Sequence, residues 1–300
     1  MLSLPYLMRP SLHLPTMTED LSNIHLSKAE FQEYGYRLVD WLAEYFDNVG
    51  QYQVLPSIEP GDIRNMLPVS APERAESMDE IIDDLDRVVM PGVAHWQHPG
   101  WYAFFPSGAS PVSALGEFVA AGLATQGMMW STAPAATEIE NTVLDWLVDL
   151  LGLPSSWRLD EGPGGGVIQM SASDSTHLSL AVARHQFELS GADANSLVAY
   201  GSSQAHSSIE KGARIAGFKH IRSVPVTQTF GIDTDAFVRI VRDDIDSGLI
   251  PAWVCSAVGT TNTTAMDPIR AIAAIAAENG MWHHADAAYA GSAMICPEFR

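Results

Sequence analysis

The feature that most constrains the fold is an alternation of short apolar segments with helical segments in the second half of the chain. The apolar segments span residues 198–200, 221–226, 250–258 and 281–285, and the helical ones span 175–189, 207–216, 235–246 and 268–279. Strands that alternate with helices in this way form parallel sheets covered by helices. We therefore predict an α/β domain with a mostly parallel central sheet.

The first part of the chain has helical patterns instead. Ser27 with Glu30, and Ser77 with Glu80, have the spacing of a capping box, in which each side chain bonds the backbone N–H of the other. Pro134 stands at the start of a further helical pattern. We predict a flexible arm at residues 1–26, a helical segment at 27–110 and the α/β domain at 111–300. The acidic run 79–86 is expected to face solvent.

Charge and cysteine content narrow the class of protein. The chain of 300 residues has 16 Lys and Arg against 36 Asp and Glu, a net charge of −20. Such a charge opposes binding to nucleic acid and to an anionic membrane. Two cysteines make no disulfide framework, and the first residues lack the basic start of a signal peptide. We expect a cytoplasmic protein without a membrane-spanning segment.

Four polar features follow strands or precede a helix of the α/β domain, where ligands of parallel sheets bind. Asp286 stands near the end of an apolar segment, and His206 follows another. A serine-rich stretch, 171–176, precedes a helix, and a threonine turn, 259–264, follows a strand. Each also has a simpler interpretation: a helix or turn cap, a structural histidine, or a polar turn. Together they suit a phosphorylated, cationic aromatic ring, and pyridoxal phosphate fits that description.

Other kinds of site are less well supported. The histidine pairs His95 with His98 and His283 with His284 lack the cysteine or carboxylate that would complete a ligand spacing, so no metal site is predicted. No serine has the glycine flanks of a nucleophile elbow. Cys255 lies in an apolar segment and is interpreted as a core residue.

Several segments match one known family. They span residues 91–107, 130–140, 164–174, 204–208, 258–261 and 284–300. The most specific part is the run Asp286-Ala287-Ala288-Tyr289-Ala290-Gly291-Ser292-Ala293 with Cys296-Pro297-Glu298-Phe299-Arg300. In these segments the chain resembles the group II pyridoxal-phosphate-dependent amino-acid decarboxylases, most closely the aromatic-L-amino-acid decarboxylase type. The resemblance implies the large domain of the type I fold of pyridoxal-phosphate enzymes, preceded by a helical segment, with pyridoxal 5'-phosphate as cofactor.

The same resemblance assigns roles to single positions. It implies that Ala172 and Ser173 cradle the phosphate, that Thr261 contacts the cofactor, and that Ala288 packs on its ring. His206 is expected to stack on the ring and transfer protons, and Asp286 to hold the ring nitrogen protonated, so these two are the expected catalytic residues. On the substrate side it implies Ser107, Trp96 and Met128.

One departure affects activity. The family's cofactor-binding lysine lies in an Asn-Pro-His-Lys-like segment downstream of Asp286, and the sequence ends at Arg300 without it; the lysines present are Lys28, Lys211 and Lys219. We expect a carboxyl-terminal part to be missing and the chain alone to be inactive. Two classes stay open: a decarboxylase acting on an aromatic amino acid, and a non-catalytic remnant. An acidic substrate or an aldehyde product are variants of the first. A homodimer is implied.

Overall fold

The computed structural model describes residues 25–73, 75–104 and 108–300. Most of the predicted arm 1–26, and Ser107, lie outside the described residues. The chain divides into two compact units, residues 1–122 and 123–300, and each is considered by itself. None of the helices in the described part has the length and apolar character needed to cross a bilayer.

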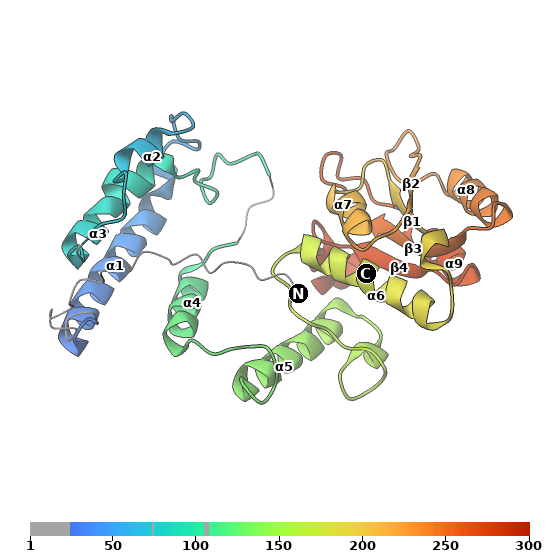
Figure 1. The fold of residues 1–300 in the computed structure, drawn as a ribbon, viewed down its shortest axis with the longest axis horizontal. Helices are drawn as coiled ribbons and strands as arrows, with labels where there is room; N and C mark the ends of the chain where they lie inside the picture. Colours follow the sequence, from blue (N-terminus) through green and yellow to red (C-terminus); the bar gives the residue numbers. More distant parts are fainter. Residues whose placement is uncertain (1–24, 74, 105–107) are drawn as a thin grey trace, which may run out of the picture. The chain divides into compact units, whose positions relative to one another are not determined.

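Unit 1 is built from helices (Figure 1). They are α1 (Lys28–Asn48), α2 (Asp62–Met66), α3 (Met78–Asp84) and the part of α4 (Pro111–Leu123) up to residue 122. Both predicted capping boxes are confirmed. The N–H of Glu30 donates to Ser27 Oγ over 3.3 Å, and the N–H of Ser27 donates to Glu30 Oε2 over 2.8 Å. These bonds satisfy N–H groups that the first turn of a helix leaves free.

The acidic run 79–86, on α3 and the helical turn that follows it, is mostly exposed, as expected, and it also ties this segment to α1. Arg37 of α1 forms an ion pair with Asp79. The indole of Trp41 donates to Asp86 Oδ1 over 3.0 Å. Solvation is therefore not the only role of these carboxylates, because two of them hold neighbouring helices together.

Unit 2 contains the predicted parallel sheet. Its strands are β1 (Leu197–Ser202), β2 (His220–Val224), β3 (Ile250–Ala257) and β4 (Trp282–Asp286), in the order β2-β1-β3-β4. Every neighbouring pair is parallel, which confirms the α/β class. The apolar residues 166–170 have no regular secondary structure, and Met170 is 96% exposed.

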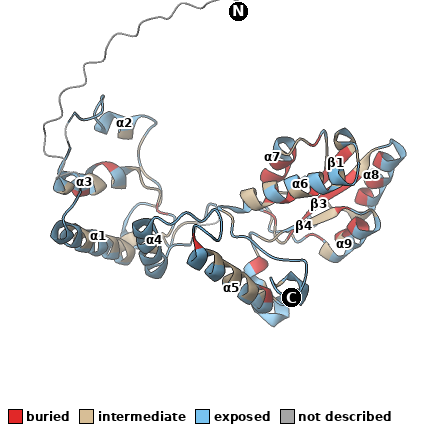
Figure 2. Ribbon diagram, turned by 60° about the horizontal axis from the view of Figure 1, so that its bottom comes forward, coloured by how far each residue is buried: buried red, intermediate tan, exposed pale blue. Residues whose placement is uncertain are grey.

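Helices cover both faces of this sheet (Figures 1 and 2). On one face α6 (Ala172–Leu189) and α7 (Ser208–Ile215) pack over Trp253, and on the other α8 (Thr234–Asp246) and α9 (Ile269–Glu278) pack over Val254. Trp253 and Val254 are both fully buried. Successive residues of a strand point to opposite faces, so the two cores are lined by alternate positions. A further helix, α5 (Pro134–Leu151), ends at Gly152, whose φ of 64° is left-handed.

Candidate functional site

The start of α6 lies at the carboxyl edge of the sheet. Ser179 Oγ accepts a hydrogen bond of 3.2 Å from the indole of Trp253, in the middle of β3. One turn nearer the helix start, Thr176 Oγ1 lies 3.4 Å from His284 Nε2 of β4. His284 pairs with Cys255, which lies two residues beyond Trp253 on β3. The contacts between α6 and the sheet are therefore nearest the strand ends at the first turns of the helix. Ala172 and Ser173 therefore stand at this edge.

The first turn of α6 has the features of an anion-binding helix start. Ser171 Oγ accepts from the N–H of Asp174 over 3.2 Å and donates to Asp174 Oδ2 over 2.9 Å. The N–H groups of Ala172 and Ser173 donate to no described residue. Free N–H groups and the helix dipole both favour an anion at this position. The arrangement fits a phosphate group.

His206 lies between β1 and α7, at the same edge. Its Nδ1 accepts the N–H of Ser208 over 3.2 Å and lies 2.9 Å from Ser208 Oγ. A backbone N–H only donates, so Nδ1 is an acceptor and the neutral ring carries its proton on Nε2. The imidazole is exposed and borders a groove of about 280 Å³ at the ends of β1 and β2. Asp286 does not line this groove.

Asp286 is the last residue of β4 and is half-buried. It pairs with Ala257 of β3, and its carbonyl oxygen accepts the N–H of Val258 over 2.8 Å. Its Oδ1 accepts the N–H of Ala288 over 3.2 Å. These bonds hold the carboxylate at the strand end and leave Oδ2 for a ligand.

The neighbouring thiol of Cys255 is buried. Burial, with a smaller contribution from the charge of Asp286, raises the pKa of the Cys255 thiol far above its usual range. A thiol that stays protonated is a poor nucleophile. The interpretation of Cys255 as a core residue is confirmed.

The turns that follow β3 and β4 lie side by side. The N–H of Ala290 donates to the carbonyl of Val258 over 3.2 Å. Gly259 has a φ of 90°, and a Cβ there would stand 2.2 Å from Cδ1 of Tyr289. Glycine is required because only it admits both this backbone conformation and the ring of Tyr289 against the turn. Thr261 and Ala288, one on each turn, are exposed.

The structure thus places six of the predicted residues at one edge of unit 2: Ala172, Ser173, His206, Thr261, Asp286 and Ala288. The substrate-side residues are placed differently. Ser107 lies outside the described residues. Trp96 belongs to unit 1, where its ring stacks on Trp101 at 4.7 Å between centroids, and Met128 of unit 2 is 72% exposed. The roles of all nine residues stay predictions.

The paired histidines of β4 point to opposite faces of the sheet. His283 Nε2 lies 2.7 Å from Ser256 Oγ, whereas His284 contacts Thr176 of α6. Burial lowers the pKa of both imidazoles. In unit 1, His95 Nδ1 lies 3.0 Å from the hydroxyl of Tyr45. Over the described ranges no three His, Cys, Asp or Glu side chains gather as metal ligands.

Sequence reasoning assigned no role at this edge to Thr176 and treated His284 only as half of a histidine pair. The signals are visible in retrospect. Thr176 stands one turn after Ala172, and His284 stands two residues before Asp286, on the same face of β4. Their contact joins the helix start to the strand that ends in the carboxylate.

Comparison with known proteins identifies the family. The family model described as "Pyridoxal-dependent decarboxylase conserved domain" matches residues 60–300. The chain is 41% identical to phenylacetaldehyde synthase of Arabidopsis thaliana and 42% identical to aromatic-L-amino-acid decarboxylase of Catharanthus roseus, in each case over 92% of this chain. It spans 57% and 56% of the length of these two relatives.

A solved structure agrees with these sequence relatives. The crystal structure of Oryza sativa TDC with PLP and tryptamine superposes with a TM-score of 0.87 and 38% identity, covering 91% of this chain and 58% of that one. Both the fold and the sequence therefore lead to the same assignment. The chain belongs to the pyridoxal-dependent decarboxylase family, whose cofactor is pyridoxal phosphate.

Proposed function

We propose that the protein containing this chain removes the carboxyl group of an aromatic L-amino acid with pyridoxal 5'-phosphate. One observation carries the proposal: the free N–H groups at the start of α6 and the carboxylate of Asp286 lie at the same sheet edge, joined through Thr176 and His284. A phosphate and a protonated ring nitrogen are the two ends of this cofactor. The family assignment supports the same chemistry.

Each residue has a distinct task in this scheme. The N–H groups of Ala172 and Ser173 bind the phosphate, and Asp286 keeps a proton on the ring nitrogen by pairing with its positive charge. When bound, pyridoxal phosphate supplies an electron sink for the pair left behind as carbon dioxide departs. His206 covers one face of the ring, with the proton on Nε2 available for transfer, and the small side chain of Ala288 leaves room on the other.

The aromatic class of the substrate is supported by the side chains of unit 1 and by the relatives. Trp96, Trp101 and Phe104 form an aromatic cluster of the kind that lines apolar pockets. The Catharanthus roseus relative is named for aromatic amino acids. The Arabidopsis thaliana relative is named for an aldehyde product, which keeps an aldehyde-forming reaction as the second candidate.

The proposal is tested by Asp286→Ala in the whole enzyme, with amine, aldehyde and carbon dioxide measured for L-tryptophan, L-tyrosine and L-glutamate. Loss of one electrostatic partner of the reacting charge is expected to reduce turnover by at least about a hundredfold. Asp246→Asn, at an exposed carboxylate of α8, is the matched control and should leave turnover unchanged. Wild-type turnover by Asp286→Ala contradicts the assignment, and the product profile separates amine from aldehyde chemistry.

We also propose that none of the three lysines of this chain binds the cofactor covalently, so the 300 residues alone do not decarboxylate. Lys28 is the first residue of α1, and Lys219 precedes β2, at the edge of the sheet opposite Asp286. Lys211 lies on the exposed side of α7, and its Nζ bonds Ser207 Oγ over 3.3 Å.

Borohydride reduction with pyridoxal phosphate, followed by peptide mapping, tests this directly. We expect no stoichiometric label on Lys28, Lys211 or Lys219, and no carbon dioxide release from the 300-residue chain. Stoichiometric labelling of any one of them, or robust decarboxylation, contradicts the proposal.

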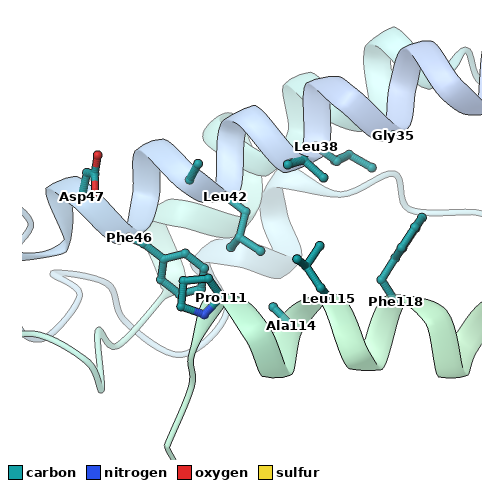
Figure 3. A pocket seen from close by; sticks show the side chains of 11 residues that line it. Gly35, Leu38, Leu42, Phe46, Asp47, Pro111, Ala114, Leu115 and Phe118 are labelled. Carbon is teal, nitrogen blue, oxygen red and sulfur yellow. The ribbon is translucent and has the colours of Figure 1, made fainter.

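A homodimer is proposed from the helices of unit 1. An apolar groove of about 330 Å³ lies between α1 and α4, lined by residues such as Leu38, Leu42, Leu115 and Phe118 (Figure 3). Leu115 and Phe118 are 55% and 53% exposed. Burying such exposed apolar area in an interface drives association. Because the resemblance implies a homodimer, we assign the groove to a second copy of the chain.

Sedimentation of the variants Leu115→Glu and Phe118→Glu tests the assignment. Both are expected to shift the protein toward monomer, because a charge is costly in an apolar interface. Ile245→Glu on α8, at a side chain that is 46% exposed, is the matched control and should not change the association state. Unchanged association of the α4 variants contradicts it.

The proposed compartment is the cytoplasm. Cys255 and Cys296 are both free, and a protein without disulfides suits a reducing compartment. A fluorescent fusion of the whole protein is expected to be cytoplasmic, and accumulation in an organelle contradicts the proposal.

A further inference from the structure

A network of side chains links α6 to the neighbouring strands β3 and β4. Thr176 Oγ1 donates to the carbonyl of Ala172 over 3.1 Å and lies 3.4 Å from His284 Nε2. The ring of His284 stacks on Trp253 at 5.5 Å between centroids. Thr176 is 1% exposed and Trp253 is fully buried, so the network is closed to water on the helix side.

The proton positions in this network follow from its geometry. The hydroxyl of Thr176 has one hydrogen, which it gives to Ala172. Its oxygen can therefore only accept from His284, and the neutral ring of His284 carries its proton on Nε2. The ring makes a directed bond to the helix and a stacking contact to β3, which together restrict its movement.

The network stands between the two groups that hold the ends of the cofactor. Ala172, whose carbonyl receives the Thr176 hydroxyl, is in the turn with the free N–H groups. Asp286 follows His284 by two residues and leaves β4 on the same face. A helix shift relative to β4 would change the distance between phosphate site and carboxylate without altering either group.

We propose that His284 is a positioning residue for Asp286: with Thr176 it holds the end of β4 against the start of α6 and sets the spacing between the carboxylate and the phosphate site. The inference rests on the proposed function for the identity of the ligand. It predicts that loss of the contact weakens binding of a ligand that engages both ends, and leaves a ligand that engages only one end unaffected.

The experiment is made in the whole protein and uses Thr176→Val, which removes the hydroxyl at nearly constant size, and Thr176→Ser, which restores it. His284→Phe keeps the ring and removes the donor. Ser179→Ala is the matched control, because it breaks the neighbouring bond from Trp253, one turn farther from the edge. Pyridoxal phosphate and pyridoxal, which lacks the phosphate, are the two probes. Hydrogen exchange of the chain without ligand is the second measurement.

We expect Thr176→Val and His284→Phe each to weaken binding of pyridoxal phosphate about tenfold, the effect of one lost buried hydrogen bond. Binding of pyridoxal should not change, and the double variant should be no weaker than either single one, because both remove the same contact. Thr176→Ser should restore affinity. Exchange should accelerate both at the N–H of Ala288, which bonds Asp286, and in the first turn of α6. Ser179→Ala should change neither affinity.

Equal losses for pyridoxal and pyridoxal phosphate, additive losses in the double variant, or unchanged exchange at Ala288 would overturn the inference. Failure of the whole wild-type protein to bind pyridoxal phosphate would instead count against the proposed function. In that case the exchange measurement still decides whether Thr176 and His284 hold β4 to α6.

Discussion

Arg222 of β2 and Asp244 of α8 form an ion pair in which Nη2 lies 2.5 Å from Oδ1 and Nε lies 3.1 Å from Oδ2. The same carboxylate accepts the hydroxyl of Tyr200 over 3.0 Å. Asp244 is 5% exposed and Tyr200 is fully buried. Burial, followed by the charge of Asp244, raises the pKa of the Tyr200 hydroxyl far above its usual range, so it remains a donor. One carboxylate thus joins a helix to two strands.

Asp244→Ala is expected to lower the free energy of unfolding of unit 2 by about 3 kcal/mol, because it leaves a partly buried guanidinium and a buried hydroxyl without an acceptor. Glu210→Ala breaks the Arg214–Glu210 pair, whose side chains are 68% and 62% exposed, and should change stability by less than about 1 kcal/mol. Urea denaturation of both variants checks the difference. Equal shifts in midpoint would show that burial of the Asp244 pair does not matter.

Gly259→Ala is expected to destabilise unit 2 more than Gly248→Ala does. Both glycines have positive φ, 90° and 80°, so alanine costs about 1–2 kcal/mol of backbone strain at either position. The space available for the alanine methyl group differs between the two positions. Nothing lies within 4 Å of a Cβ at Gly248, whereas the ring of Tyr289 occupies the position of a Cβ at Gly259. Thermal unfolding measures the comparison. An equal loss at the two positions contradicts the packing of Tyr289 on the turn.

The capping boxes predict a dependence on pH. Hydrogen bonds from the N–H and then the hydroxyl of Ser77 hold the pKa of Glu80 below its ordinary value of 4.5. A lowered pKa means that the ionised carboxylate stabilises the folded state above that value and that this contribution is lost as the pH falls through the folded pKa. The stability difference between wild type and Glu80→Gln should therefore shrink in acid. A difference that stays constant with pH contradicts this.

The buried imidazole of His283 also makes the stability of the fold depend on pH, and in the same direction as Glu80. Burial lowers its pKa from the ordinary 6.5, so the unfolded chain takes up a proton that the folded chain does not. Stability should fall as the pH is lowered below 6.5. His283→Gln keeps a hydrogen-bonding group for Ser256 and removes the titration, so its unfolding free energy should depend less on pH in that range. Identical slopes for the two proteins would rule out this contribution.

Local patterns were sufficient to predict the four strands and the main helices of unit 2. The predicted helix 235–246 is α8, Thr234–Asp246, because its apolar face and its Asp233 cap are both encoded locally. Helix α6 begins earlier than predicted, at Ala172 rather than 175. Ser171 caps it by accepting the N–H of Asp174, and a serine-rich stretch offers several residues of equal capping ability.

Relationships between distant residues were not predictable in the same way. Asp286 could be placed at a strand end, because parallel strands end at one edge. The contact of Thr176 with His284 joins residues 108 apart in sequence, and nothing in either segment alone specifies it. The strand order β2-β1-β3-β4 is likewise a property of long-range packing.

The opposite orientation of His283 and His284 has a consequence for how β4 must assemble. A slip of one residue against β3 would exchange their positions, turning His283 toward α6 and directing Asp286 to the layer of α8 and α9. The imidazole bonded to Ser256 and the one bonded to Thr176 each oppose such a slip. The two adjacent histidines thereby fix the register of β4, so that only the correctly aligned strand presents the Asp286 carboxylate at the edge where α6 begins.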